Sequence, residues 1–253
     1  MLKLNNVTIK FGGLIAVNDV SLEVKEKCIY GLIGPNGAGK TTLFNIISGV
    51  YKPTSGEVLF KEKKISGLQP FQINQLGIAR TYQNINLFKS MTVLENVMVG
   101  RHSKSNSGLI SSILGIKSQR VEEKQIVEKC QEILDFMNLS DKADYLSRNL
   151  SYGEQRRLEI SRALACEPQI LLLDEPAAGM NSKEKEDLKD IIRKISDKGI
   201  TIIIVEHDMK LVMGITDAIS VLNYGKQIAF GEPKYIQNHP QVIEAYLGGS
   251  SNG

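Results

Sequence analysis

The sequence has no tryptophan, only three cysteines among 253 residues, and no large excess of either charge, with a net charge of +3. The cysteines are scattered and odd in number, without a CxxC spacing: Cys28, Cys130 and Cys166. This usage favours free thiols in a reducing compartment. Because no strongly basic face is indicated, we expect no nucleic-acid partner.

Long apolar runs are missing as well. The longest, residues 170–173 and 201–205, have the length of strands and are too short to span a bilayer. The first ten residues, MLKLNNVTIK, lack the apolar core of a signal peptide. We therefore expect a cytoplasmic chain that reaches a membrane only through a partner. Its 42% hydrophobic composition allows one large domain, or one domain with a subdomain.

Strand-length apolar segments alternate with helical segments through much of the chain, which predicts an α/β fold with a largely parallel sheet. Residues 1–30 predict an N-terminal subdomain of short antiparallel strands, and residues 71–98 predict short helix and loop. From about residue 120 to 164 the pattern is helical. We expect one domain over 1–253, with an inserted helical subdomain at about 84–165. A short apolar helix is expected near Leu109–Leu114, and a flexible tail at 248–253.

A phosphate-binding motif follows the apolar segment CIYGLIG. GPNGAGKT, at 34–41, matches G-x-x-x-x-G-K-[ST] and opens a helix. Its glycines allow backbone N–H groups to face phosphate oxygens, Lys40 would neutralise phosphate charge, and the Thr41 hydroxyl suits Mg²⁺. The motif predicts a P-loop nucleoside triphosphatase. The residues expected to contact the nucleotide through this motif are Gly34, Pro35, Asn36, Gly37, Ala38, Gly39, Lys40, Thr41 and Thr42.

An acidic strand end supplies the chemical partner of that loop. ILLLDEP buries a strand and places Asp174 and Glu175 at its carboxyl end, where ligands bind in open α/β sheets. Asp174 would hold Mg²⁺, and Glu175 would orient or deprotonate the attacking water. Two solvated carboxylates are the alternative. His207 ends the next strand and could reach the γ-phosphate, although a lone histidine is more often structural. Taken alone, Gln83 is more often an amide in a loop than a ligand.

The segment LSYGEQRRLEISRAL, residues 150–164, begins like a capped helix. Ser151 is a good N-cap, and Glu154 occupies the capping-box position three residues later. From these residues alone, an ordinary surface helix explains the pattern.

Taken in order, GPNGAGKT, Gln83, LSYGEQ, LLLDEP and His207 resemble the nucleotide-binding subunit of ATP-binding-cassette transporters over nearly the whole chain. The resemblance implies ATP and Mg²⁺ as cofactors. It also implies that the helix at 150–164 acts in trans, on ATP held by a second subunit. The residues implied at that contact are Ser151, Tyr152, Gly153 and Glu154, of which Tyr152 and Glu154 depart from the common LSGGQ.

The resemblance gives three further residues a place. Phe11 would stack on adenine, with core packing of its strand as the alternative. Gln83 would sense Mg²⁺ and the attacking water while facing a membrane partner, and would therefore count with Thr41 and Asp174 as a metal residue and with Glu175 and His207 as a catalytic one. Asn181 stands where many members have aspartate.

Segments outside the motifs give a finer resemblance. EHDMKLVMGITD, LSYGEQRRLEI and NHPQVIEAYLGG are similar to ATPase subunits of bacterial and archaeal branched-chain amino-acid importers. The ATPase of lipopolysaccharide extraction is the closest alternative. A cassette ATPase acting on ribosomes or DNA ends fits less well, because the chain has one motif set and no sustained heptads. A generic kinase or GTPase leaves LSYGEQ and His207 unexplained.

The expected assembly follows from this family. A second ATPase subunit, the same or related, would complete the site, and separate transmembrane permeases would hold the chain at the cytoplasmic face of the membrane. A substrate-binding protein would act indirectly. We expect the permease contact at Gln83 and at residues 84–89, where Leu87 and Phe88 could be exposed. Alternatively, these two side chains pack inside the domain.

Overall fold

The computed structural model describes residues 1–101 and 117–247, and side chains except those of 117–123. The chain forms two compact units, one of Met1–Arg80 with Gln169–Gly253 and the other of Thr81–Pro168. The second unit starts at Thr81 rather than at 84 and ends at Pro168 rather than at 165. The short helix expected near Leu109–Leu114 and the tail at 248–253 lie outside the described residues.

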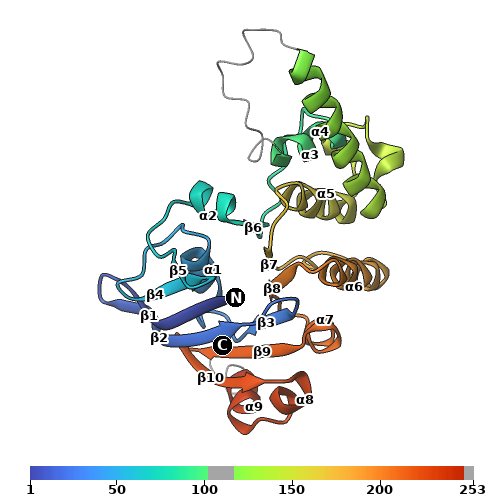
Figure 1. The fold of residues 1–253 in the computed structure, drawn as a ribbon. Helices are drawn as coiled ribbons and strands as arrows, with labels where there is room; N and C mark the ends of the chain where they lie inside the picture. The colour runs from blue at the N-terminus through green and yellow to red at the C-terminus, as the bar shows by residue number, and fades with distance from the viewer. Residues whose placement is uncertain (102–116, 248–253) are drawn as a thin grey trace. The chain divides into compact units, whose positions relative to one another are not determined.

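The first unit begins with an antiparallel sheet in the order β2-β1-β4-β5 (Figure 1). Its strands are β1 (Leu2–Phe11), β2 (Leu14–Val24), β4 (Ser55–Phe60) and β5 (Lys63–Lys64). The expectation of short strands at the N-terminus is wrong, since β1 has 10 residues and β2 has 11. Their pairing shifts register between Leu4 and Val7 and again before Ile9. These irregularities interrupt the alternation of apolar and polar residues, so that one long strand reads as short pieces.

The second sheet of this unit has six strands in the order β10-β9-β3-β8-β7-β6. The strands are β3 (Ile29–Ile33), β6 (Ile78–Arg80), β7 (Ile170–Asp174), β8 (Thr201–Val205), β9 (Ala218–Asn223) and β10 (Lys226–Gly231). All neighbours pair in parallel except β10 with β9, which confirms the largely parallel sheet. Strand β6 falls where only helix and loop were expected, because three residues are too few to show a period of two.

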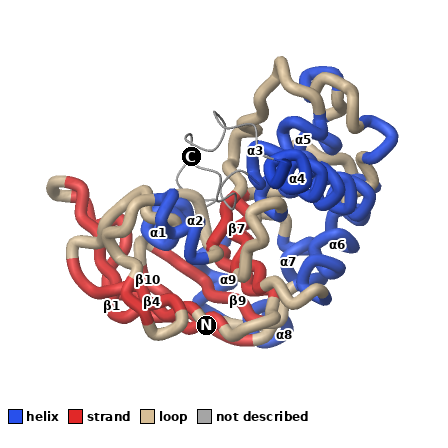
Figure 2. Tube along the Cα trace, turned by 45° about the horizontal axis from the view of Figure 1, so that its top comes forward, coloured by secondary structure: helices blue, strands red, loops and turns tan. Residues whose placement is uncertain are grey.

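Helices cover both faces of this sheet. Alternation along β3 sends Leu32 to one face and Ile33 to the other. Leu32 packs with Leu43 and Phe44 of α1 (Lys40–Ile47) and with the antiparallel sheet. On the other face, Ile33 packs with Val212 of α7 (Met209–Ile215). Figures 1 and 2 show α1 and α7 on opposite sides of the strands. Because β3, β8 and β7 are parallel neighbours, their carboxyl ends lie at one edge of the sheet, where β3 leads into α1. Ligands bind at this edge in such sheets.

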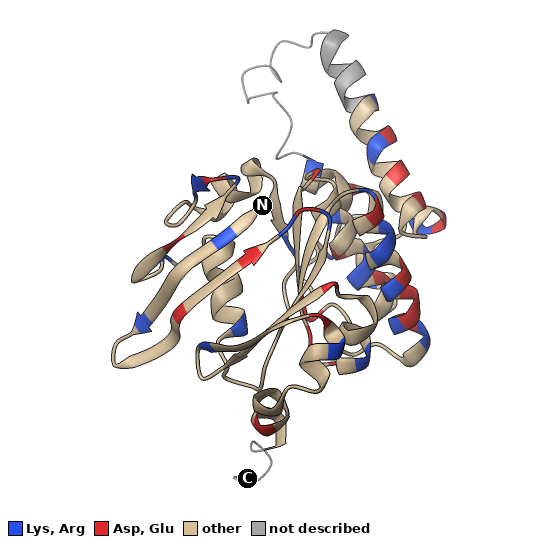
Figure 3. Ribbon diagram, turned by 60° about the horizontal axis from the view of Figure 1, so that its bottom comes forward, with Lys and Arg blue, Asp and Glu red and all other residues tan. Residues whose placement is uncertain are grey.

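The remaining helices of the unit are α2 (Pro70–Leu76), α6 (Ser182–Asp197), α8 (Pro233–Gln237) and α9 (Pro240–Leu247). Helix α6 buries one stripe, formed by Leu188, Ile191, Ile192 and Ile195, and its other face carries charge. Figure 3 shows residues of both charges interspersed along the helices.

The second unit is helical. It contains α3 (Val93–Arg101), α4 (Lys117–Phe136) and α5 (Tyr152–Leu164), with 3₁₀ turns at Ser140–Lys142 and Ser147–Asn149. Cys130 and Leu134 of α4 and Leu158 of α5 are fully buried in it. The helical pattern expected from 120 to 164 is interrupted after Phe136, where Asn138 takes a left-handed conformation (φ 54°). No helix in residues 1–101 or 117–247 combines the length and apolar character needed to cross a membrane.

Candidate active site

The phosphate loop joins β3 to α1, as its motif predicts. Gly34, Gly37 and Gly39 all have positive φ, of 151°, 78° and 101°. A Cβ on Gly39 would lie 2.6 Å from the carbonyl oxygen of Ala16, so the loop depends on glycine there. No side chain caps α1, whose N-cap is Gly39. The loop thus presents the N-terminus of a helix without an internal side-chain acceptor, and such a terminus attracts anions.

Lys40 is the cation of this loop and is 5% exposed. Its Nζ donates to the carbonyl oxygens of Gly34 at 2.7 Å and Pro35 at 2.9 Å. Burial lowers the pKa of Lys40 below its ordinary value, and the nearby carboxylates of Glu175 and Asp174 act in the opposite direction. Lys40 and the two carboxylates, which are predicted from two separate motifs, therefore lie close enough to interact. A phosphate here would meet a desolvated ammonium, which strengthens the attraction between them.

Asp174 ends β7 and is 2% exposed. Its Oδ2 accepts a hydrogen bond of 2.8 Å from a terminal nitrogen of Arg80, whose side chain is 7% exposed. Removing one partner of such a buried ion pair costs roughly 3–5 kcal/mol of stability. Asp174 is thus a buried carboxylate held in one orientation at the carboxyl end of the sheet.

Glu175 and His207 meet at the ends of the neighbouring strands β7 and β8. The Nε2 atom of His207 lies 2.8 Å from Oε1 of Glu175. Glu175 has a left-handed backbone (φ 48°), which is strained for a residue with a side chain, and strain of this kind gathers at functional sites. Its backbone N–H donates to the carbonyl oxygen of Val205 at 2.9 Å, which fixes the turn. The two residues form an acid–base pair beside Lys40 and Asp174.

Glu206 hydrogen-bonds to the backbone next to this pair and is 4% exposed. Its carboxylate accepts hydrogen bonds from the backbone N–H groups of Ala177 at 2.6 Å and His207 at 3.0 Å. Burial raises the pKa of Glu206, and the charge of Glu175 adds to this shift, whereas the backbone donors oppose it. One buried side chain thereby ties the segment after Glu175 to the segment that carries His207.

The residues present fit Mg²⁺ bound together with a nucleotide. The described part of the chain has no cluster of three or more His, Cys, Asp or Glu side chains that could hold a metal by itself. Mg²⁺ does not need one, because it is usually bound by one or two carboxylates together with substrate phosphates. Thr41 at the start of α1 and Asp174 at the end of β7 could supply the protein ligands.

In the second unit, Ser151 caps α5 in a complete capping box. Its Oγ accepts from the N–H of Glu154 at 3.4 Å, and the Glu154 carboxylate accepts from the N–H of Ser151 at 2.9 Å. Glu154 also pairs with Lys142, and hydrogen bonding to Lys142 and Ser151 lowers its pKa despite partial burial. Ser151 and Tyr152 are exposed, whereas Gly153 is buried. The N-terminus of α5 is therefore fixed by its own side chains. The hydroxyl of the exposed Ser151 accepts one hydrogen bond and can still donate one to an external ligand.

Phe11 and Asn181, both in the first unit, have local roles. Phe11 is 43% exposed and packs edge-on against Tyr51, with ring centroids 5.2 Å apart. The alternative of core packing for Phe11 is therefore wrong. Asn181 is the N-cap of α6 and accepts from the N–H of Glu184 at 3.0 Å. An amide performs that role as well as a carboxylate does.

Gln83 lies in the second unit and is exposed, and its carbonyl oxygen accepts from Arg156. In the segment that follows, Leu87 is half-buried and Phe88 is 46% exposed, with Arg162 over its ring at 5.8 Å. Packing inside the domain thus describes Leu87 in part and Phe88 poorly.

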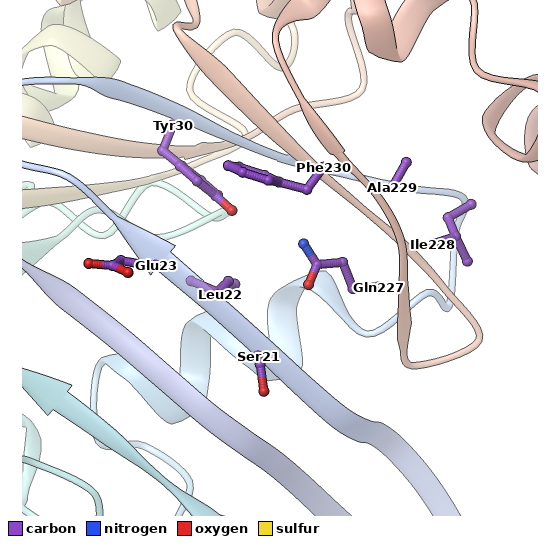
Figure 4. Close-up of a pocket in the computed structure, with 8 residues that line it drawn as sticks. All are labelled: Ser21, Leu22, Glu23, Tyr30, Gln227, Ile228, Ala229 and Phe230. Carbon is purple, nitrogen blue, oxygen red and sulfur yellow. The ribbon is translucent and has the colours of Figure 1, made fainter.

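A separate pocket of about 460 Å³ lies between β2 and β10 of the first unit (Figure 4). Tyr30 and Phe230 stack there with ring centroids 6.1 Å apart. None of the predicted site residues lines it. The phosphate loop and the strand ends beside it are therefore not part of this pocket.

Two contributors to the site were not predicted from the sequence, Arg80 and Glu206. Arg80 ends a strand too short to detect. Glu206 belongs to none of the motifs, although a carboxylate directly before a candidate catalytic histidine was the available signal.

A phosphate loop between strand and helix, with an acidic strand end beside it, defines a P-loop nucleoside triphosphatase. Comparison with known families is more specific: residues 17–178 match the family model described as ABC transporter. The chain belongs to the ABC transporter family, as an ATP-binding and ATP-hydrolysing subunit. A second model, described as branched-chain amino acid ATP-binding cassette transporter, matches residues 226–251.

Individual relatives agree with this assignment. The high-affinity branched-chain amino acid transport ATP-binding protein LivG of Salmonella typhimurium is 46% identical over 249 residues, which is 98% of each chain. A crystal structure of a nucleotide-free ATP-binding cassette from an ABC transporter is 34% identical, with a TM-score of 0.85 over 97% of this chain and 98% of that one. A dimeric structure of a bacterial ABC transporter cassette is 29% identical, with a TM-score of 0.78 over 92% and 99%.

Proposed function

We propose that this chain is the ATPase subunit of an importer for branched-chain amino acids. The observation that carries the proposal is the 46% identity to LivG over 98% of both chains. The match of residues 226–251 to a branched-chain amino acid cassette model supports it from a segment outside the phosphate loop. The chain would bind peripherally at the cytoplasmic face of a membrane, with separate permeases and, indirectly, a substrate-binding protein as partners.

The proposed chemistry uses the residues at the strand ends. The N-terminus of α1 and Lys40 would bind the phosphates, and Phe11 would stack on the adenine. Thr41 and Asp174 would hold Mg²⁺, which would supply positive charge to neutralise the phosphates. Glu175 would accept the proton of the attacking water, and His207 would donate its single N–H to the γ-phosphate. Gln83 would sense Mg²⁺ and the attacking water, as the family resemblance implies.

A second subunit would complete this site. Ser151, Tyr152, Gly153 and Glu154 at the start of α5 would face the γ-phosphate bound by the partner. A single donor to developing negative charge is worth about 10²–10³ in rate, so a lone subunit should bind ATP but hydrolyse it slowly. ATP would hold the two subunits together and hydrolysis would release them. The permeases would move with the two subunits, because they would contact the surface at Gln83 and residues 84–89.

The test is transport in a defined system. The chain is reconstituted in liposomes with the permeases that co-purify with it from native membranes and with their binding protein. Leucine-loaded binding protein should stimulate ATP hydrolysis and drive ATP-dependent leucine accumulation, and the Lys40→Ala variant should do neither. Stimulation by another cargo with leucine inert would refute the substrate class, and a stimulated ATPase with no permease present would refute the transport role.

A further inference from the structure

One buried guanidinium joins three segments of the first unit. Arg80, the last residue of β6, uses one terminal nitrogen to donate to Oδ1 of Asn45 at 2.6 Å and to Oγ of Ser48 at 2.8 Å. Its other terminal nitrogen donates to Oδ2 of Asp174 at 2.8 Å. The guanidinium carbon lies 5.6 Å from the ring centre of Phe44. Arg80 therefore connects the helix that follows the phosphate loop to the strand end that carries the acidic residue.

Arginine suits this position for geometric reasons. Its N–H donors are fixed in one planar group, so the contacts of one terminal nitrogen determine the direction in which the other terminal nitrogen points. Asn45 of α1 and Ser48, the C-cap residue that follows it, bind one terminal nitrogen, and the other terminal nitrogen then sets the position of Oδ2 of Asp174. A lysine would keep the charge but supply a single ammonium, which could not make both sets of contacts at these distances.

We propose that Arg80 is a positioning residue for magnesium, which orients the Asp174 carboxylate relative to α1 and so sets how tightly the metal is held with ATP. The inference rests on the proposed function, because it takes Asp174 as a metal ligand. Substitution of a residue that hydrogen-bonds to a metal ligand commonly changes the metal affinity by about 10–100-fold. Because both side chains are buried, their hydrogen bond of 2.8 Å holds Oδ2 of Asp174 in one position.

The test separates metal binding from nucleotide binding. The affinity for ATP is measured in EDTA and again in excess Mg²⁺, by competition with a fluorescent ATP analogue. For Arg80→Lys we expect an affinity about tenfold weaker than wild type in Mg²⁺ and within twofold of wild type in EDTA. The Mg²⁺ concentration for half-maximal hydrolysis at saturating ATP should rise by a similar factor. Arg101→Lys is the matched control, since Arg101 is paired with Glu167 at 2.7 Å in the other unit.

A second pair of variants keeps the arginine in place. Asn45→Ala and Ser48→Ala each remove one hydrogen-bond acceptor of Arg80, on α1 or at its C-cap, and leave the charge, so they should shift the Mg²⁺ dependence in the same direction by a smaller factor. These variants decide the matter if Arg80→Lys does not fold. Equal losses in EDTA and in Mg²⁺, or a Mg²⁺ dependence within twofold of wild type, would overturn the proposal. Failure of the wild-type chain to bind ATP at all would instead overturn the proposed function.

Discussion

Glu175 is the residue on which turnover should depend most. It lies 2.8 Å from His207 and one residue past the buried Asp174. Glu175→Gln keeps the size of the side chain but cannot accept a proton from water. We expect ATP affinity within a few-fold of wild type, hydrolysis lowered by more than tenfold, and a stable ATP-bound dimer, since hydrolysis is the step proposed to separate the subunits. Size-exclusion chromatography with ATP and a phosphate-release assay measure both effects. A variant that stays monomeric with ATP, or that hydrolyses within tenfold of wild type, would contradict this role.

Glu206 is predicted to matter for stability as well as for rate. In Glu206→Gln, an amide N–H would face one of the backbone donors of Ala177 and His207, leaving a buried group unsatisfied at a cost of about 1–3 kcal/mol. For a chain of this size, where 1 kcal/mol shifts the melting temperature by about 2–4 °C, that corresponds to a melting temperature lower by roughly 2–12 °C. Thermal denaturation measures the change. Glu186→Gln, whose side chain is 69% exposed, is the control and should leave the melting temperature unchanged.

The raised pKa of Glu206 adds a pH dependence. Burial holds its pKa in the folded state above the value of the unfolded chain, so the folded state binds a proton more readily. The contribution of this group to stability is therefore fully present below the unfolded pKa and is lost as pH rises through the folded one. The difference in unfolding free energy between wild type and Glu206→Gln should fall as pH increases above about 4.5. A difference that grows over that range would show that the pKa is lowered instead.

At the scale of elements, the junction between β3 and α1 depends on backbone conformation. Gly39 is the N-cap of α1 with φ 101°, and a Cβ there would approach the carbonyl oxygen of Ala16. Gly39→Ala should therefore weaken ATP binding by at least tenfold, because the loop must move away from the phosphate position. Gly13→Ala is the control: it has open space around the added Cβ and no positive φ, and should bind ATP like wild type. Equal affinity of the two variants would contradict this reading of the loop.

Elements with a local signature were predictable from the sequence. The phosphate loop is one continuous motif, and Asp174 and Glu175 follow four apolar residues of a buried strand. Strand β6 carries no such signature, because three residues cannot show a period, and its place in the sheet is decided by pairing with β7. The role of Arg80 has no local signature either, because its partners are 32 to 94 residues away along the chain. Long-range hydrogen bonds of this kind have no trace in spacing or composition.

At the scale of the whole molecule, the proposed dimer can be tested by mixing variants. Lys40→Ala damages the phosphate loop of one subunit, and Ser151→Ala damages the helix that would serve its partner. In a mixed dimer both lesions fall on the same composite site, so the other site is intact. The mixture should hydrolyse ATP faster than either variant alone.

The pair Lys40→Ala with Glu175→Gln is the matched control for this mixing experiment. Both lesions affect a subunit's own phosphate site, so every mixed dimer has two damaged sites and should show no recovery. Thr92→Ala alone controls for the loss of a helix cap in the second unit, since the Thr92 hydroxyl accepts from the N–H of Glu95 at 3.1 Å. Recovery in the control pair, or none in the test pair although mixed dimers form, would count against a site shared between subunits.

The left-handed backbone at Glu175 lowers the stability of the fold at a residue on which ATP hydrolysis is proposed to depend. A side chain in that conformation costs about 1–2 kcal/mol, a cost that glycine would not incur. Selection of random variants for heat resistance alone should therefore enrich glycine at position 175, and asparagine to a lesser degree, and each such protein should melt higher than wild type while hydrolysing almost no ATP. Selection that also requires growth on imported amino acid should return glutamate. Position 175 would then mark a place where this fold gives up stability to keep a working base.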